Sequence, residues 1–151
     1  MSYINFSKTT EYAFRILSYM AMDESRLYTA NELFENLNIP FRYLRKQLTI
    51  LSKSELITSE QGKKGGYHIT KSTEEIFLSD ILTATMEQKG NDCFFGFESC
   101  ALQAKCVMHD KWAEMQDILL TMLTTTNLAE LINKGPQAFK LNKSFLNIKN
   151  D

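Results

Sequence analysis

The sequence predicts a mainly α-helical chain with a small β wing, arranged as a winged helix-turn-helix domain followed by a long C-terminal dimerisation helix. Three observations carry this prediction: two short helices joined by a tight connection at 37–39, a glycine-rich basic hairpin at 56–70, and a long two-faced helix over 106–126. With 151 residues, of which 44% are hydrophobic and 23% charged, the chain has the composition of a globular protein of about one domain.

The first two helices each follow a residue that can accept a hydrogen bond from a helix N-terminus. Ser7 precedes a predicted helix over 8–22, in which apolar residues recur at helical spacing, and Thr29 precedes a shorter helix over 30–36. Residues 37–39 then make a tight connection to the third helix.

The third predicted helix, over 40–53, is strongly two-faced, and proline at position 40 suits a helix start. Its apolar stripe consists of Phe41, Leu44, Leu48 and Leu51, and its opposite face carries Arg42, Arg45, Lys46, Thr49 and Lys53. A helix pair whose second member presents cationic side chains is typical of a DNA-reading helix-turn-helix. The alternative is an ordinary solvated helix surface.

A basic hairpin directly after this helix favours the DNA-reading interpretation. Strands over 56–59 and 67–70 flank a segment, 60–66, that holds three glycines and two lysines. Glycine tolerates the positive φ angles of hairpin tips, and the lysines could reach phosphates while the helix enters the major groove. A phosphate-binding loop is excluded, because no helix begins after Gly66 and no lysine–serine or lysine–threonine pair follows the glycines.

Charge is distributed unevenly along the chain, although the net charge is only −1. Residues 40–71 hold seven Lys or Arg against two Glu, a net of +5, whereas residues 76–151 hold seven against nine acids, a net of −2. A basic strip on a near-neutral protein is typical of a sequence-reading DNA binder. The expected DNA contacts are Arg42, Tyr43, Arg45, Lys46 and Gln47 from the helix, and Lys63 and Lys64 from the wing.

The C-terminal half contains a short helix over 80–86 capped by Ser79, an irregular segment over 88–105, the long helix over 106–126, and a last short helix over 127–133. Apolar residues of the long helix alternate at spacings of four and three, which favours packing across a dimer interface, with packing inside one subunit as the alternative. The expected interface residues are Trp112, Met115, Leu119 and Met122.

Three cysteines, Cys93, Cys100 and Cys106, lie within fourteen residues, and His109 follows the last of them by three residues. Thiolates suit iron–sulfur clusters, Zn(II) or Cu(I), but the short C-x2-C pairs of structural zinc sites are missing from the sequence. Cys106 and His109 are about one helical turn apart, so both could face one metal. The alternative is three unconnected thiols.

Several sequence features that would indicate secretion, membrane insertion or catalysis are missing. The first ten residues do not resemble a secretion signal, and no apolar run approaches the ~18 residues of a membrane helix, so a cytoplasmic protein is expected. The sequence shows no cofactor fingerprint, no catalytic nucleophile arrangement and no ferredoxin C-x2-C-x2-C run, so neither an enzyme nor an electron carrier is expected.

Taken together, several segments resemble the winged-helix regulators of the IscR, NsrR and RirA type, the Rrf-two family. The resemblance covers about residues 4–133. Its matching pieces are residues 8–13 (KTTEYA), 39–51, 62–67, the three cysteines, 106–112 (CVMHDKW) and 126–131 (TNLAEL).

The resemblance implies a homodimeric transcription factor, expected to be a repressor, that binds double-stranded promoter operator DNA. It also implies one iron–sulfur cluster per subunit, [2Fe-2S] or [4Fe-4S], that senses iron–sulfur status, nitric oxide or redox state. The three cysteines carry over as ligands. The fourth ligand stays open, because some members use a histidine that matches His109 and others use an acidic residue of the partner's first helix, at the position of Glu11.

Three departures from the family pattern limit what can be transferred. The first cysteine gap is one residue longer than in many relatives, which leaves the cluster type open. Gln61 stands where many relatives carry arginine, and Arg45 where the biogenesis regulator carries glutamate, so its operator preference does not carry over. The alternative function is a winged-helix regulator that uses its cysteines as a zinc site or thiol switch, or that is controlled by a protein partner.

The sequence also suggests a division of the chain. The DNA-binding domain is expected over 1–86 and the cysteine-bearing loop over 87–106. The dimerisation helix with the last short helix is expected over 107–134, followed by a weakly ordered tail over 135–151.

Overall fold

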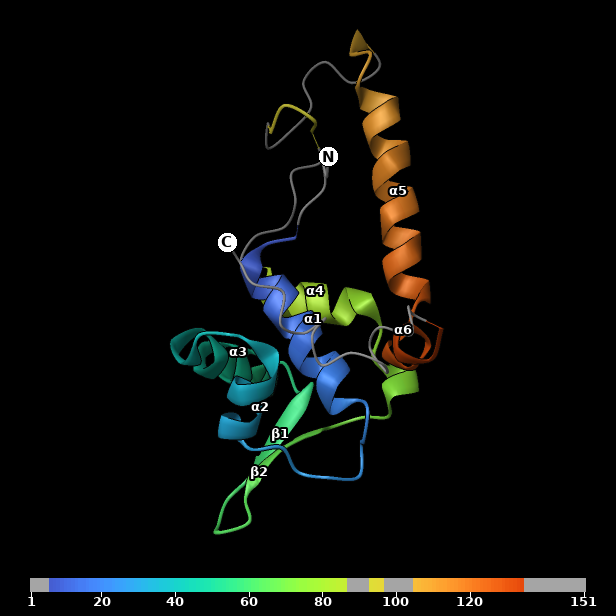
Figure 1. Ribbon diagram of the computed structural model, residues 1–151. Coiled ribbons are helices and arrows are strands. Elements are labelled where there is room, and N and C mark those ends of the chain that lie inside the picture. Colours follow the sequence, from blue (N-terminus) through green and yellow to red (C-terminus); the bar gives the residue numbers. More distant parts are fainter. Residues whose placement is uncertain (1–5, 87–92, 97–104, 135–151) are drawn as a thin grey trace.

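The computed structural model describes residues 6–86, 93–96 and 105–134. The elements are α1 (Lys8–Met20), α2 (Ala30–Leu37), α3 (Phe41–Lys53), β1 (Ile57–Glu60), β2 (Gly66–Ile69), a 3-10 helix η1 (Thr73–Glu75), α4 (Leu78–Thr85), α5 (His109–Thr125) and α6 (Leu128–Lys134). Helices α1 to α4 and the hairpin form a body from which α5 projects, with α6 at the base of α5 (Figure 1). The expected fold class is confirmed within the described residues.

The predicted caps of the first two helices are confirmed. The Ser7 hydroxyl accepts a hydrogen bond from the Thr10 backbone N–H at 3.2 Å, and the Thr29 hydroxyl accepts one from that of Glu32 at 3.1 Å. Asn38 adopts a left-handed conformation with φ of 50°, which ends α2 and makes the tight turn into α3. The helix-turn-helix is therefore built from local signals that the sequence displays.

The start of α4 corrects the sequence prediction. This helix begins at Leu78, one residue before Ser79, and its N-cap residue is Phe77. The carboxylate of Asp80 accepts a hydrogen bond from the Phe77 backbone N–H at 2.9 Å, so the acid in the first turn satisfies a free donor there. Ser79 therefore lies inside the helix and does not cap it.

Other helix ends also differ from expectation. Helix α1 ends at Met20 rather than at residue 22, and α5 begins at His109, three residues later than expected. Helix α6 is shifted by one residue, to Leu128–Lys134. Most of the irregular segment and the tail after residue 134 lie outside the described residues.

The core surrounds α1, which contacts α2, α3, α4, α6 and β2. Three of the four residues of the predicted α3 stripe are buried in it, whereas Phe41, at the first turn, is 39% exposed. The largest fully buried side chains are Tyr28, Ile16, Leu17, Met20, Leu33, Leu37, Ile39, Leu44, Leu48, Leu51, Ile57 and Ile76.

The wing is an antiparallel hairpin that is tied to the body at its base. Ile57 pairs with Ile69, and Glu60 with Gly66. Tyr28 and Tyr67 exchange two backbone hydrogen bonds of 2.8 Å, which fastens β2 to the loop before α2. A Cβ atom at Gly66 would come within 2.8 Å of the Tyr28 carbonyl oxygen, so only glycine permits this approach. The base of the wing is thus fixed relative to the helix pair.

The C-terminal helices join the same core. Leu123 near the end of α5 and Leu128 at the start of α6 are both buried in it. Leu78 donates its backbone N–H to the Thr126 carbonyl at 3.0 Å, and Leu128 donates to the Ile76 carbonyl at 2.8 Å. The end of α5 is therefore clamped to the winged-helix body by both side chains and backbone. No helix in the described part of the chain has the length and apolar character needed to span a membrane.

Two buried threonines link α1 to α4. The hydroxyls of Thr10 and Thr85 are 2.9 Å apart, and both side chains are buried. Thr85 donates its hydrogen to the Ile81 carbonyl at 2.9 Å, so the Thr10 hydroxyl is the donor within the pair. This bond holds the end of α4 against the start of α1.

Replacing Thr85 tests the value of this bond. In Thr85→Ala the buried Thr10 hydroxyl loses an acceptor, so the free energy of unfolding should fall by about 1–3 kcal/mol. The matched control is Thr83→Ala, an exposed position of the same helix, which should change it by less than about 0.5 kcal/mol. Urea unfolding followed by circular dichroism measures both variants. Equal losses would show that the hydroxyl pair does not stabilise the fold.

Candidate DNA-binding surface and cysteine site

The outward face of α3 carries four of the five expected DNA contacts. Arg42, Tyr43, Arg45 and Lys46 are all exposed. The Arg42 guanidinium lies 4.9 Å from the centre of the Tyr43 ring and donates a hydrogen bond to the Tyr43 hydroxyl at 3.1 Å. The Tyr43 ring in turn lies 6.2 Å from that of Tyr12 on α1. Stacking thus orders part of this cationic face before any ligand binds.

Gln47 is a correction to the expected contact set. Its side chain is only 1% exposed, so it cannot reach a DNA base in this conformation. Gln47 lies three residues after Leu44 and four before Leu51, on the face of α3 that packs against the body. Its Oε1 atom has no hydrogen-bond partner within the described residues. Polarity alone had suggested an outward position, whereas helical phase places the side chain inward.

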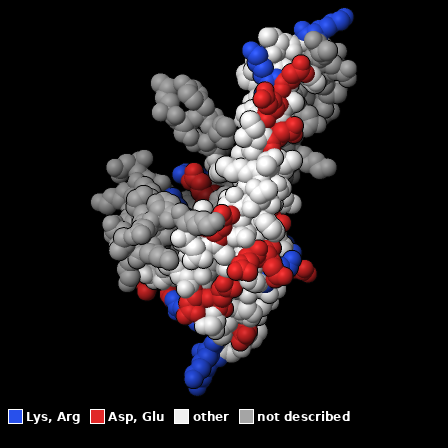
Figure 2. Space-filling model, turned by 90° about the vertical axis from the view of Figure 1, so that its right-hand side faces the viewer, with Lys and Arg blue, Asp and Glu red and all other residues white. Residues whose placement is uncertain are grey.

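The wing tip presents the two expected lysines to solvent. Lys63 and Lys64 are exposed in the turn between β1 and β2. Gly62 has a φ of +124°, a conformation that L side chains rarely adopt, and its carbonyl accepts a hydrogen bond from the Gly65 N–H at 3.0 Å. Figure 2 shows a basic projection at the lower tip, where the wing lies, with acidic side chains spread over the face above it.

An aromatic pair at the helix-turn-helix was not singled out by sequence reasoning. Phe34 on α2 and Phe41 at the start of α3 pack edge to face, with ring centroids 5.5 Å apart. Both are exposed, at 44% and 39%, beside the cationic face of α3. The helical spacing of Phe41 had suggested a buried position. Two exposed rings in this place are suited to apolar contact with a nucleic acid.

Two of the three cysteines and the expected histidine share one small cavity at the N-terminal end of α5. Its volume is about 10 Å³. It is lined by Cys93, Phe94, Phe95, Cys106, Met108, His109 and Trp112. Cys93 and Cys106 both carry free thiols, and Cys93 is buried. The remaining expected ligand, Cys100, lies outside the described residues.

The ligand types of this cavity suit a soft metal, although the described part of the site is incomplete. Two thiols and an imidazole are donors that bind iron, zinc or copper. No three His, Cys, Asp or Glu side chains among the described residues are close enough together to hold a metal ion. Phe94 and Phe95 are exposed, so their displacement could enlarge the cavity. The donor chemistry therefore fits an iron–sulfur cluster that also uses a ligand from outside the described residues.

The alternative fourth ligand, Glu11, lies on α1 and not at this cavity within the same chain. Its carboxylate forms an ion pair with the Lys8 ammonium at 2.7 Å, and its side chain is about one third exposed. Only His109, of the two candidates, lies beside the thiols of its own chain.

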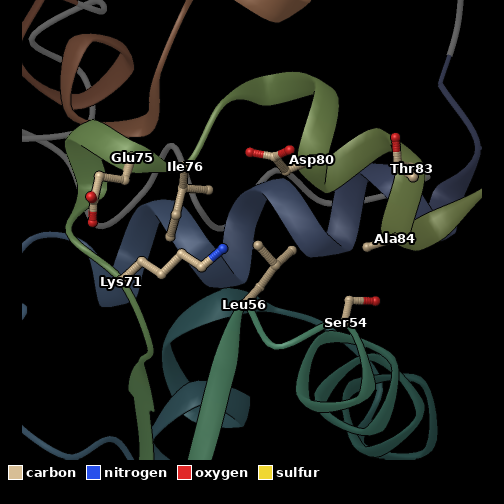
Figure 3. Close-up of a pocket in the computed structure, with 8 residues that line it drawn as sticks. All are labelled: Ser54, Leu56, Lys71, Glu75, Ile76, Asp80, Thr83 and Ala84. Carbon is tan, nitrogen blue, oxygen red and sulfur yellow. The ribbon is translucent and has the colours of Figure 1, made fainter.

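A larger cleft, of about 320 Å³, lies where the wing meets α4. It is lined by Ser54, Leu56, Lys71, Glu75, Ile76, Asp80, Thr83 and Ala84 (Figure 3). The Lys71 side chain extends across it between Leu56 and Ile76. None of the residues expected to contact DNA or metal lines this cleft, and its charged side chains are exposed.

Comparison with known proteins identifies relatives over most of the chain. The model of the Rrf2 family, described as iron-dependent transcriptional regulator, matches residues 6–134. A transcriptional regulator of the helix-turn-helix type from Aquifex aeolicus is 30% identical over 131 residues, which are 85% of this chain and 91% of that protein. IscR of Pectobacterium atrosepticum is 29% identical over 117 residues, 78% of this chain but only 66% of the longer relative.

Solved structures show the same fold. IscR of T. potens superposes with a TM-score of 0.72 at 18% identity, over 90% of this chain and 91% of that one. CymR, the global cysteine regulator of B. subtilis, superposes with a TM-score of 0.71 at 18% identity, over 87% and 98%. The relatives are transcriptional regulators and not enzymes. With its winged helix-turn-helix body and the family match over residues 6–134, this chain belongs to the Rrf2 family of transcriptional regulators.

Proposed function

We propose that this chain is a cytoplasmic, homodimeric repressor whose affinity for operator DNA is controlled by an iron–sulfur cluster. Cys93, Cys100 and Cys106 would hold the cluster, with His109 as the fourth ligand. The observation that carries the proposal is that Cys93, Cys106 and His109 line one cavity at the free end of α5. The other end of that helix is clamped to the DNA-binding body.

The elements next to the cysteines give the site two connections to the body. On one side, α4 ends at Thr85, which is hydrogen-bonded to Thr10 of α1. On the other side, α5 runs from His109 to the buried Leu123. When bound, a cluster supplies an iron that responds to oxidants, nitric oxide or iron supply. A change at the cysteines that shifts either helix end would then favour one arrangement of the DNA-binding body over another.

The second candidate is regulation through the thiols alone or through zinc. It is favoured by the small cavity, which has less room for a polynuclear cluster than for bare thiols or a single metal ion. The relative described as a global cysteine regulator has the same fold. Analysis of iron and acid-labile sulfide in anaerobically purified protein separates the two candidates.

The DNA-binding surface can be tested with Arg45→Ala and Lys64→Ala. Loss of a base-reading arginine should weaken binding to the operator by about 1–3 kcal/mol at particular base pairs. Loss of a phosphate-contacting lysine should weaken all sequences alike and lower the salt dependence. Fluorescence anisotropy at two salt concentrations, with the protein's own promoter DNA and an unrelated duplex, measures both effects.

The control for this experiment is Lys111→Ala, which removes an exposed charge from α5 rather than from α3 or the wing. It should leave DNA affinity unchanged. If Arg45→Ala and Lys64→Ala bind promoter DNA as tightly as the control, then α3 and the wing do not contact DNA.

The fourth ligand can be tested by reconstituting variants anaerobically with iron and sulfide. His109→Ala should alter the absorption and resonance Raman spectra, because the histidine lies at the thiol cavity. Glu11→Ala should leave them unchanged. His68→Ala removes the chain's other histidine, which faces Glu60 in the wing at 3.6 Å, and serves as control. A spectrum altered only by Glu11→Ala would assign the partner's Glu11 instead, and zinc uptake without sulfide would refute the cluster.

The dimer is proposed to form on α5, as the sequence pattern suggests, but its exposed apolar residues shift the centre of the interface. Trp112, Met115 and Leu119 are half-buried within their own chain, and Leu119 packs against the core. Ile118 and Met122, one turn apart on the same face, are 65% and 49% exposed. A second copy of the chain would remove these side chains from water.

A charge at Ile118 should therefore dissociate the dimer. Ile118→Glu would bury an unpaired carboxylate in the interface and weaken association at least about tenfold, equivalent to about 1.4 kcal/mol. Thr124→Glu places the same charge on another face of α5, where Thr124 is exposed, and should leave association unchanged. Sedimentation velocity over a concentration series measures both. Unchanged association of Ile118→Glu would move the interface away from this face.

A further inference from the structure

The indole of Trp112 has a hydrogen-bond donor that finds no partner among the described residues. Its Nε1 atom is buried and meets no acceptor in the described part of the chain. An indole nitrogen can only donate, and buried donors in folded proteins are nearly always paired. An unpaired donor in such a position indicates that an acceptor belongs nearby.

The surroundings of this indole indicate which group could accept its hydrogen bond. Trp112 lines the same cavity as Cys93 and Cys106. The ring is held by an edge-to-face contact with Phe94, with centroids 5.3 Å apart, and Phe94 packs in the same way on Phe95 at 5.1 Å. The indole therefore shares one small cavity with an aromatic neighbour and two thiols.

The chemistry of the lining favours sulfur as the acceptor. The other groups in the lining are phenyl rings, the Met108 thioether, which is only a weak acceptor, and the His109 imidazole, which is expected to bind metal. A cysteine thiolate or an inorganic sulfide carries negative charge, and charge strengthens a hydrogen bond. The buried N–H is thus better matched to an anionic sulfur than to any neutral group of the cavity.

We propose that Trp112 is a positioning residue that donates its indole N–H to a sulfur atom of the metal site, either a ligand thiolate or a cluster sulfide. This inference rests on the cluster function proposed above. It assigns a role at the metal site to a residue that is not itself a metal ligand. Such N–H···S bonds stabilise negative charge on the sulfur, so they make a cluster easier to reduce and help to hold it in place.

The proposal can be tested directly, because Trp112 is the chain's only tryptophan. Ultraviolet resonance Raman spectroscopy reports hydrogen bonding at the indole nitrogen, and every tryptophan band of this protein comes from this residue. Anaerobic reconstitution of the full chain with iron and sulfide should shift the N–H marker band towards the position of a hydrogen-bonded indole. A band that does not move on cluster binding would overturn the proposal.

Two variants add an independent readout. Trp112→Phe keeps an aromatic ring but removes the donor, so the midpoint potential of the reconstituted cluster should become more negative. Val107→Ala changes an exposed side chain that does not line the cavity and keeps the donor, so it should retain both the potential and the band shift. Equal potentials in the wild type and Trp112→Phe would contradict the proposal. Circular dichroism and sedimentation verify that both variants are folded and have the wild-type association state.

These outcomes separate the inference from the function on which it rests. Suppose that a cluster assembles, that the indole band does not shift, and that Trp112→Phe has the wild-type potential. The cluster function then stands and the hydrogen bond is refuted. If the wild type takes up iron but no sulfide, Cd²⁺ serves as a redox-inert probe that binds thiolates. In that case the missing sulfide refutes the cluster, and a band shift with Cd²⁺ would support the N–H···S bond at a mononuclear thiolate site. The absence of a shift would refute the N–H···S bond as well.

Discussion

The burial of α1 is the interaction on which the rest of the structure depends. Ala13, Ile16, Leu17 and Met20 are completely buried, and every helix of the body and one wing strand pack on this helix. Because the apolar stripe of α3 must turn towards α1, its arginines and its two lysines must turn outward. The loop that contains Tyr28 is bonded to β2 and fixes the wing beside α3. The basic helix face and the basic wing tip are therefore consequences of one buried contact surface.

The geometry of α5 explains how a distant site could influence this body. Between His109 and Leu123 the helix rises by about 21 Å at 1.5 Å per residue, so the cavity lies well away from the core (Figure 1). A rigid helix clamped at one end converts a small change at the clamp into a larger displacement of its free end. If ligand binding at the cavity changes the affinity for DNA, then DNA binding changes the affinity of the cavity for its ligand by the same factor. The Thr10–Thr85 bond gives the opposite side of the cysteine segment a second, polar attachment to α1.

Charge segregation gives the molecule one side suited to DNA. Its net charge of −1 would not attract a polyanion, but five of its basic side chains are concentrated on α3 and the wing tip: Arg42, Arg45, Lys46, Lys63 and Lys64. Acidic side chains dominate the face shown in Figure 2 above that tip. Repulsion by these carboxylates would disfavour approach of DNA from the acidic side, so electrostatics orients the complex as well as strengthening it.

The sequence by itself determined the features that depend on short-range chemistry. These are the Ser7 and Thr29 caps, the amphipathic phase of α3, the glycine turn of the wing and the types of ligand in the cysteine segment. The helical phase of Gln47 also lies in the sequence, whereas tertiary packing alone decided the exposure of Phe41 and the attachment of α6 to the core. It also placed at the thiol cavity the buried N–H of Trp112, which meets no acceptor in the described part of the chain. Caps and helical periodicity are set within a few residues, whereas burial depends on which distant surfaces meet, and no local pattern records that.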